Sequence, residues 1–162
     1  MANTSLIKVA VNKKNGATYS KTLLLNTNRV LDFERNTSTG LCDFYYDFGQ
    51  FDLKNRAVLF ACSAYTVNNL TWAINRADTT QDRFYIHIEK IRQTGHSEIK
   101  KDKMVKLYSD QIIFGYDHAD GLGCYIWITR GSDVYRIDTS HTLDDIIRAA
   151  SKSASLSRSP MS

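Results

Sequence analysis

Proline is nearly missing from this sequence. A single Pro, at position 160, stands among 162 residues that include nine Tyr and seven Phe. Because proline interrupts strand ladders and aromatic residues favour strands, this balance indicates a strand-rich protein. Apolar residues make up 43% of the chain and charged residues 23%, close to the averages of globular proteins, so wholesale disorder is not expected.

Long apolar runs and paired cysteines are also missing. No stretch approaches the ~18 apolar residues of a membrane span, and the N-terminal segment has no apolar run that could form the core of a signal peptide. We therefore expect a soluble protein of the cytosol, with no secretion and no membrane partner. Cys42, Cys62 and Cys124 are odd in number and widely spaced in apolar stretches, which predicts buried free thiols instead of disulfides or metal ligands.

Sequence motifs of common enzymes do not occur. The chain contains neither GxGxxG, GxxxxGK[ST] nor GxSxG. His87, His96, His118 and His141 lack the i, i+3 or i, i+4 pairing of helical metal sites. The segment 116–123 has clustered acidic residues and two glycines, but it lacks the terminal Glu of a calcium loop and is interpreted as a tight turn. We expect no catalysis, no cofactor and no metal.

Charge is distributed unevenly along the chain. Residues 1–76 carry nine Lys or Arg against five Asp or Glu, whereas residues 77–162 carry twelve of each. Lys13-Lys14 and the lysines of segment 100–106, with Tyr and Phe nearby, would suit a nucleic-acid-binding small β-barrel. Asp102 interrupts the second cluster, and the strongest RNA-binding signature is absent. Nucleic-acid binding is therefore an alternative that we do not favour.

The two halves of the sequence align with each other in three blocks. The blocks follow the same order in both halves, as duplication of one module would leave them. Two unrelated β segments that each end in a helix are the alternative interpretation. The alignment places Ile7 with Ile86 in the first block, Leu23 with Val105 and Cys42 with Cys124 in the middle block, and Val67 with Leu143 in the last.

Each half is interpreted as several strands followed by one helix. Asn15-Gly16 predicts a hairpin turn because both residues tolerate positive φ. Thr66 and Thr142 precede apolar residues at helical spacing, and a Thr hydroxyl there can accept the unpaired N–H groups of the first turn. We predict that both are helix N-caps. In the first half, the strand segments are 6–11, 20–26, 29–34, 41–48 and 56–62.

These patterns predict a strand-rich α+β fold. It consists of two duplicated small β modules of about five strands each, and a short C-terminal helix closes each module. The modules span residues 1–76 and 77–151. Residues 152–162 are rich in Ser and contain no acidic residue, so we predict a flexible tail there.

Large aromatic residues occupy both faces of the predicted strands. The segments Cys42–Phe48 and Tyr125–Ile128 either form an association surface that the helices leave uncovered or fill both sides of a packed sheet. Tyr45 on the strand, and Lys152 and Arg158 in the tail, are the candidate partner contacts.

The second half also resembles a known group of proteins. Val134-Tyr-Arg-Ile137, followed by Ser140-His-Thr-Leu-Asp-Asp-Ile146, is similar to the small β modules in structural proteins of tailed bacteriophages, including crAss-like phages. The resemblance covers residues 82–150 and more loosely 5–76, where the acidic cap is missing.

This resemblance implies a non-enzymatic component of the virion. It would be an auxiliary, head-decorating capsid protein, a connector or tail-ring protein, or a packaged protein. The implied partners are major capsid or head-tail proteins and copies of the chain itself. The implied location is the virion, assembled in the host cytoplasm, and no functional residue is carried over from the resemblance.

Overall fold

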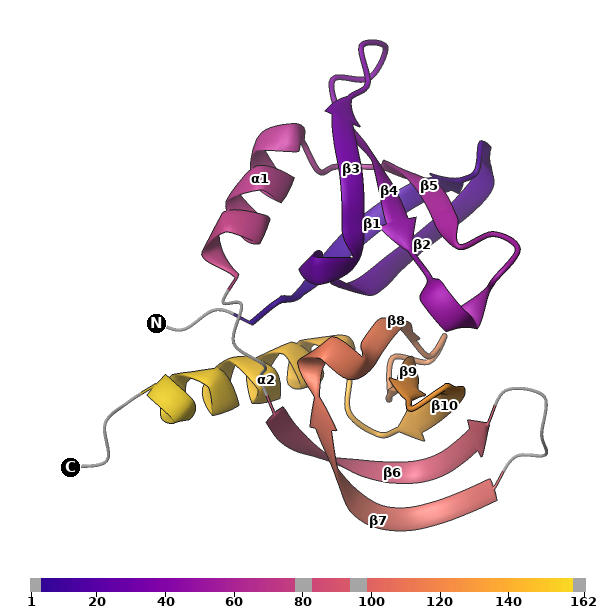
Figure 1. Cartoon of the computed structure of the whole chain (residues 1–162), viewed down its shortest axis with the longest axis vertical. Helices are drawn as coiled ribbons and strands as arrows, with labels where there is room; N and C mark the ends of the chain where they lie inside the picture. The colour runs from indigo at the N-terminus through magenta and orange to yellow at the C-terminus, as the bar shows by residue number, and fades with distance from the viewer. Residues whose placement is uncertain (1–3, 78–82, 94–98, 159–162) are drawn as a thin grey trace.

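The computed structural model describes residues 4–77, 83–93 and 99–158, with only the backbone for residues 99–101 and 152–158. Within these residues there are a single ten-stranded antiparallel sheet and two α-helices (Figure 1), which confirms the strand-rich fold. The elements are β1 (Leu6–Lys14), β2 (Ala17–Asn26), η1 (Thr27–Arg29), β3 (Val30–Arg35), β4 (Cys42–Asp47), η2 (Gly49–Phe51), β5 (Ala57–Cys62), α1 (Val67–Arg76), β6 (Arg83–Gln93), β7 (Ile99–Tyr108), η3 (Ser109–Gln111), β8 (Ile112–Asp117), β9 (Cys124–Arg130), β10 (Asp133–Thr139) and α2 (Leu143–Arg158).

The first hairpin forms where the sequence predicts it. Asn15 and Gly16 take φ angles of 51° and 83°, and they connect β1 with β2. The same turn also contacts β5, since the Asn15 N–H donates to the Leu59 carbonyl at 2.7 Å and the Asn15 side chain accepts from the Leu59 N–H at 2.9 Å. The hairpin tip is therefore held against its neighbouring strand.

The strands follow the same order in both halves of the sheet. The order is β3-β4-β5-β1-β2 and then β8-β9-β10-β6-β7. The bounds of the elements recur with the order. Residues 17–26, 27–29 and 30–35 form β2, η1 and β3, while residues 99–108, 109–111 and 112–117 form β7, η3 and β8. Each element of the second set begins and ends later in the chain than its counterpart in the first set by the same number of residues. This number equals the distance along the sequence from Leu23 to Val105, which the alignment pairs, and we call it the repeat offset.

One pair of strands connects the two halves. Strand β2 pairs antiparallel with β8, with Leu24 opposite Gly115 and Leu25 opposite Phe114. Gly115 is required by space, because a Cβ atom there would lie 2.6 Å from the carbonyl oxygen of Tyr125 on β9. We call this pairing the β2–β8 junction, and through it the sheet passes from residues 6–62 to residues 83–139 without a break.

The hydrophobic cores of the two halves exchange residues at the junction. Ile113 and Phe114 of β8 are buried within the core of the first half. Leu6 and Leu24, from β1 and β2, are buried within the core of the second half. Burial of each such side chain stabilises the fold by roughly 1.5–3 kcal/mol, so neither half keeps its complete core alone.

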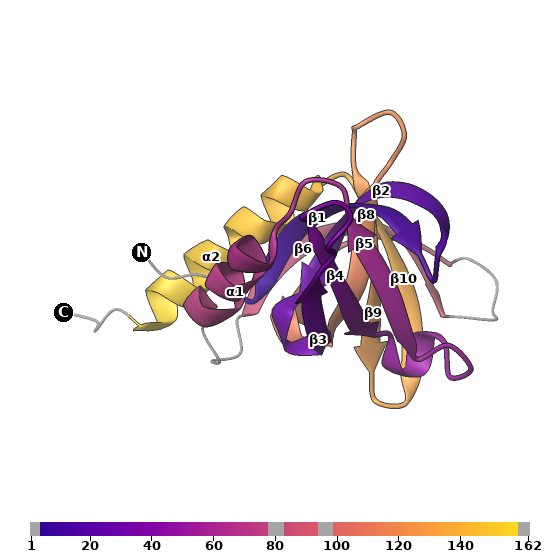
Figure 2. The ribbon, with the colours of Figure 1, turned by 90° about the horizontal axis from the view of Figure 1, so that it is seen from above.

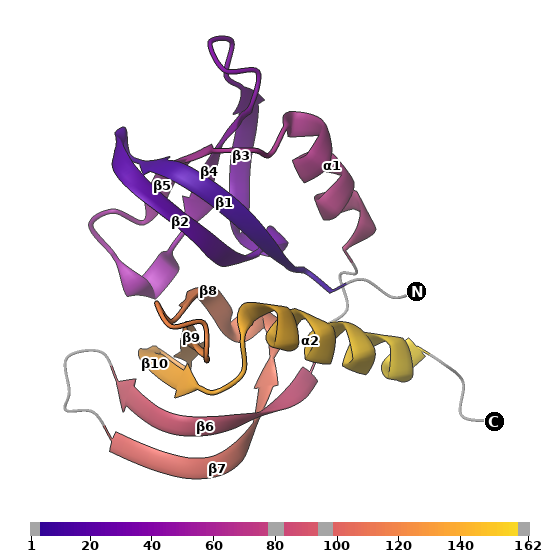
Figure 3. The same cartoon turned by 180° about the vertical axis from the view of Figure 1, so that it is seen from behind.

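The helices cover different parts of the sheet. Helix α1 contacts β3, β4 and η1 of its own half. Helix α2 contacts β6 and β8 of its own half and also β1 of the first half. Figures 1 and 3 accordingly show α2 between the strands of the first half and the pair β6–β7. Helix α2 therefore closes the second half and also connects it to the first.

The C-terminal segment differs from its prediction. Helix α2 continues to Arg158, so residues 152–158 have helical backbone where composition predicts a flexible tail. Residues 152–159 contain neither glycine nor proline, and the Lys, Ala, Leu and Arg residues that stand between the serines are good helix formers. Since the helix has already been nucleated by its packed first turns, these residues only extend it. Figure 2 shows that this end of α2 extends beyond the sheet.

Tyr46 provides a test of how much the junction stabilises the fold. Its buried hydroxyl accepts from the Asn26 N–H at 2.7 Å and donates to the Ile113 carbonyl at 2.5 Å, which bridges the two halves. Tyr46→Phe leaves both buried groups unpaired and should cost about 1–3 kcal/mol, which lowers Tm by ~2–4 °C per kcal/mol. Tyr45→Phe on the exposed face is the control and should melt within about 0.5 kcal/mol of the original protein. Equal melting of both variants would contradict this role.

Candidate assembly surface

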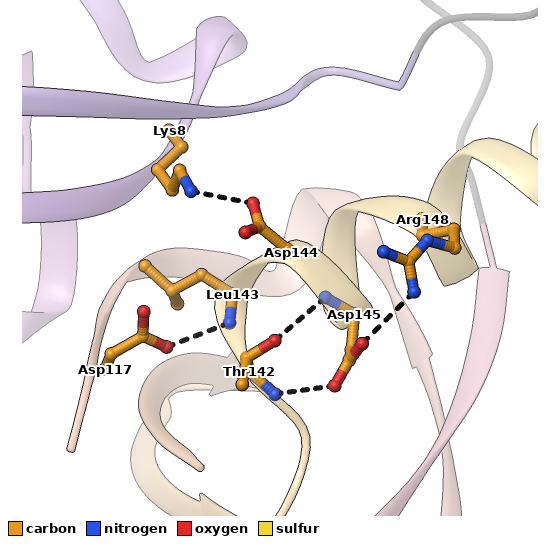
Figure 4. Close-up of polar contacts among 7 residues, drawn as sticks. All are labelled: Lys8, Asp117, Thr142, Leu143, Asp144, Asp145 and Arg148. Atoms are coloured by element: carbon orange, nitrogen blue, oxygen red, sulfur yellow. Dashed lines mark hydrogen bonds and ion pairs between the residues drawn. The ribbon is translucent and has the colours of Figure 1, made fainter. Parts of the chain in front are cut away.

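The first turn of α2 is capped by its own side chains (Figure 4). Thr142 Oγ1 accepts from the Asp145 N–H at 3.3 Å, and Asp145 Oδ2 accepts from the Thr142 N–H at 3.0 Å. The hydrogen bond from the Thr142 backbone holds the pKa of Asp145 below its usual value. Thr66 and Asn69 form the same reciprocal pair at α1, with distances of 3.2 and 2.8 Å. Both threonines thus lie at helix N-caps.

Two further contacts bind the start of α2 to its surroundings. Asp117, at the end of β8, accepts from the Leu143 N–H at 3.0 Å. Lys8 on β1 forms an ion pair with Asp144 at 2.8 Å (Figure 4), which connects the helix to the first half of the chain. Helix α1 has Asn68 where α2 has Asp144, so its first turn carries no such charge.

The cap of α2 has a measurable contribution to stability. Thr142→Ala removes the acceptor for the Asp145 N–H and should lower the free energy of unfolding by about 1 kcal/mol. Thr142→Ser keeps the hydroxyl and serves as the control, with a smaller loss expected. Chemical denaturation followed by circular dichroism measures the difference, and identical midpoints for Ala and Ser would mean that the hydroxyl does not cap the helix.

Aromatic rings pack across the β2–β8 junction. Trp127 stacks on Phe114 with ring centres 4.6 Å apart and planes 2° from parallel, and Phe114 stacks on Phe48 at 4.9 Å. The edge of Phe51 contacts Phe114 at 4.9 Å. Most aromatic residues of the two segments singled out in the sequence therefore fill packed space at and near the junction.

A cation lies beside this aromatic group. Lys21 Nζ of β2 is 3.9 Å from the ring centre of Tyr116 on β8. The ammonium group and the ring attract each other because the face of the ring is electron-rich. This contact adds a charged interaction to a junction that the Tyr46 hydroxyl already bridges with hydrogen bonds.

Tyr45 lies outside the junction, on the exposed face of β4. Its side chain is 43% exposed, and Leu31 on the adjacent strand β3 is 57% exposed. Next to them is a hollow of about 230 Å³ between β3, β4 and β5. Its lining is mainly acidic and apolar: Asp32, Phe33, Glu34, Asp43, Tyr45 and Leu59. We call this region, together with Leu31, the β3 surface.

The opposite end of the sheet has the opposite charge. Lys103, Met104 and Lys106 of β7 are exposed, with Met104 at 57%. Asp102 on the same strand lies 2.6 Å from His87 of β6. We call the exposed side chains of residues 103–106 the β7 surface. Among the described residues, β3 and β7 each pair with one neighbouring strand, so each has an unpaired backbone edge.

Elsewhere, titratable side chains gather around Cys124, which lies within electrostatic range of Asp117, Asp138 and Asp145. Within the described residues, no group of three or more His, Cys, Asp or Glu is arranged to hold a metal ion. His118 Nε2 and Asp138 Oδ1 lie 2.8 Å apart in a largely buried pair. Burial raises the pKa of the Cys42 thiol to about 11 and that of Cys62 to about 12.

The cysteines match the prediction of buried free thiols. Cys42, Cys62 and Cys124 are all buried and unpaired. Burial also raises the pKa of Cys124. Because the thiolate is the reactive form, these three thiols are poor nucleophiles in the folded protein.

Two candidate partner contacts and one of the four histidines lie outside the described side chains. Lys152 and Arg158 are on the helical backbone of α2, and their side chains lie outside the described part of the chain. His96 lies outside the described residues altogether. The sequence analysis did not single out Leu31 and Glu34, which are exposed on β3, although charged side chains on short strands are typical of exposed sheet edges.

Comparison with known proteins adds no family. No protein-family model, no curated protein and no solved structure matches the chain. In the described ranges, neither helix is long and apolar enough to cross a membrane. The geometry of the junction and of the two sheet edges is therefore the basis for assigning a function.

Proposed function

We propose that this chain is a non-enzymatic structural subunit that binds other proteins in a larger assembly. The observation that carries the proposal is the pair of unpaired sheet edges, β3 and β7, at the two ends of one continuous sheet within the described residues. An exposed edge presents a row of backbone N–H and C=O groups that can pair with another strand. Exposed Leu31, Tyr45 and Met104 beside these edges supply apolar contact area.

We also infer that the chain arose by duplication of one module of five strands and a helix. Identical strand order in both halves supports this inference, as does the recurrence of β2, η1 and β3 at the repeat offset. Duplicated modules are a common way to make a protein whose surfaces recur at regular spacing. Such regularity suits a subunit of an ordered assembly better than a single catalytic pocket.

The assembly that we propose is the virion of a tailed bacteriophage. The resemblance carried by Val134–Ile137 and Ser140–Ile146 supports this choice. The chain would serve as an auxiliary, head-decorating capsid protein or as a connector or tail-ring component. Its partners would be major capsid or head-tail proteins and further copies of itself, and it would enter the particle in the host cytoplasm.

The alternative function is binding of nucleic acid by a small β-barrel. Lys103 and Lys106 on β7, together with exposed Lys13 at the tip of the first hairpin, favour it. Against it, Lys14 lies 5.1 Å from the ring centre of Phe48 and Lys21 lies over Tyr116, so these two lysines face aromatic rings of the protein itself. Asp32, Glu34 and Asp43 would repel a phosphate backbone at the other end of the sheet.

Purified particles of the phage that encodes this chain test the virion assignment. Quantitative mass spectrometry should find the chain at a fixed copy number per particle, retained after a high-salt wash and nuclease treatment. A chain that is abundant in infected cells but absent from washed particles would contradict the proposal.

Salt dependence distinguishes the alternative function. Fluorescence anisotropy with random-sequence DNA and RNA should give little binding at about 50 mM salt and no steep loss between about 50 and 200 mM. Phosphate binding through several lysines would instead weaken by orders of magnitude over that range, because counterions are released. Tight binding with a steep salt slope, and loss of that binding in Lys103→Glu, would favour the nucleic-acid function.

A further inference from the structure

We propose that the partner of the β7 edge is the β3 edge of a second copy of this chain, paired in the same register as the β2–β8 junction. The proposal deepens the structural function above and rests on it. In this arrangement each copy uses one edge to bind the next copy and the other edge to bind the previous one. Such a head-to-tail contact extends the sheet from chain to chain.

The register follows from the recurrence of the elements. Strand β7 corresponds to β2, because it follows β2 by the repeat offset, and β3 corresponds to β8, because β8 follows β3 by the same offset. A β7–β3 pair therefore joins the counterparts of the two strands that form the β2–β8 junction. The offset relates Leu24 to Lys106 and Gly115 to Phe33. Because Leu24 lies opposite Gly115, Lys106 should lie opposite Phe33. The junction itself has two such residue pairs, and continuing the antiparallel register by two residues places Met104 opposite Arg35.

The Lys21–Tyr116 contact identifies the central interaction between copies. Lys103 occupies the position of Lys21, and Glu34 occupies the position of Tyr116. The cation over an aromatic ring at the junction is thus replaced by a cation beside a carboxylate. Lys103 and Glu34 are both exposed, and within the described part of the chain neither forms an ion pair.

Charge also decides which edges can meet. The β3 surface carries Asp32, Glu34 and Asp43, whereas the β7 surface carries Lys103 and Lys106. Two β3 edges would bring like charges together, and two β7 edges would do the same, which disfavours symmetric pairing. Arg35 on β3 and Asp102 on β7 each offset one of these charges, but the β3 surface stays net acidic and the β7 surface stays net basic. The unlike pair therefore joins opposite net charges, so the contact is directional.

The contact between copies should be weaker than the internal junction. At the junction, Phe114 stacks on both Trp127 and Phe48. The β3 surface has Asp32 in the position of Phe114 and the half-exposed ring of Tyr45 in that of Trp127. The association therefore depends more on charge, and it should be reversible and sensitive to salt.

Charge reversal at the two edges tests the pairing. Analytical ultracentrifugation of the full chain at low salt should show association that increases with protein concentration. Lys103→Glu and Glu34→Lys should each raise the dissociation constant about tenfold or more, since each places like charges at the contact. Lys54→Glu makes the same charge change on an exposed turn outside both edge strands and should leave association unchanged.

Mixing the two variants tests direction. In an equal mixture, the new glutamate at position 103 of one variant meets the new lysine at position 34 of the other. The alternate contact joins the unchanged Lys103 and Glu34, so association should return to the original strength. The double variant Lys103→Glu with Glu34→Lys should also associate by itself. Both restorations require residue 103 of one copy to meet residue 34 of another copy. If neither the mixture nor the double variant regains association, the proposal is overturned.

Cross-linking tests the register. Arg35→Cys and Met104→Cys place one thiol on each edge, at positions that should lie opposite each other. A short bismaleimide should cross-link a mixture of these two variants far more than either variant alone, because the native cysteines are buried and unreactive. Lys54→Cys mixed with Met104→Cys is the matched control, and equal yields in both mixtures would contradict the register.

The outcomes separate this inference from the proposed function. If the chain is present in washed particles but stays monomeric at all concentrations and gives no Arg35–Met104 cross-link, the pairing between copies is wrong and the structural function stands. If the chain associates through these edges but is absent from particles, the virion assignment fails and the pairing stands.

Discussion

The pairing of β2 with β8 is the constraint on which the rest of the structure depends. It places Ile113 and Phe114 in the core of the first half and Leu24 in the core of the second. It also requires Gly115, because the backbone of β9 passes where a Cβ would lie. Since each half lacks part of its core without the other, we expect the two halves to unfold together.

The same pairing determines which edges remain exposed. Because β2 pairs with β8, these two strands lie in the middle of the sheet. Within the described residues, β3 of the first half and β7 of the second half are then the two end strands, and each has one unpaired edge. These edges differ in charge, with Asp32 and Glu34 on β3 and Lys103 and Lys106 on β7. Exposed edges of opposite charge are protected from pairing with themselves, and they remain able to pair with each other.

Much of the fold could be predicted from local patterns. Asn15-Gly16 predicted a hairpin because only a few residues tolerate its positive φ, and apolar alternation located the strands of the first half to within about three residues at each end. The β2–β8 junction could not be predicted in this way, because it joins residues from opposite halves of the chain and no local pattern encodes which edge meets which. The length of α2 was missed because composition argues for disorder, whereas extension of an existing helix needs no apolar face.

The candidate site was predicted less well, and for a related reason. Tyr45 was identified from its place in an aromatic strand, and its ring is indeed exposed. Glu34 was not singled out and Lys103 entered only as one of the lysines of segment 100–106, because the pairing proposed for them depends on the two ends of a sheet that forms only in three dimensions. The repeat offset was the one sequence signal that links these two residues to Lys21 and Tyr116.

Amide hydrogen exchange as a function of protein concentration tests the central claim most directly. The account predicts that peptides covering β3 and β7 become protected together as the protein associates, while the already paired β2 and β8 keep the same protection in dilute and concentrated samples. Association with unchanged exchange at both edges, or protection of one edge without the other, would contradict a head-to-tail continuation of the sheet.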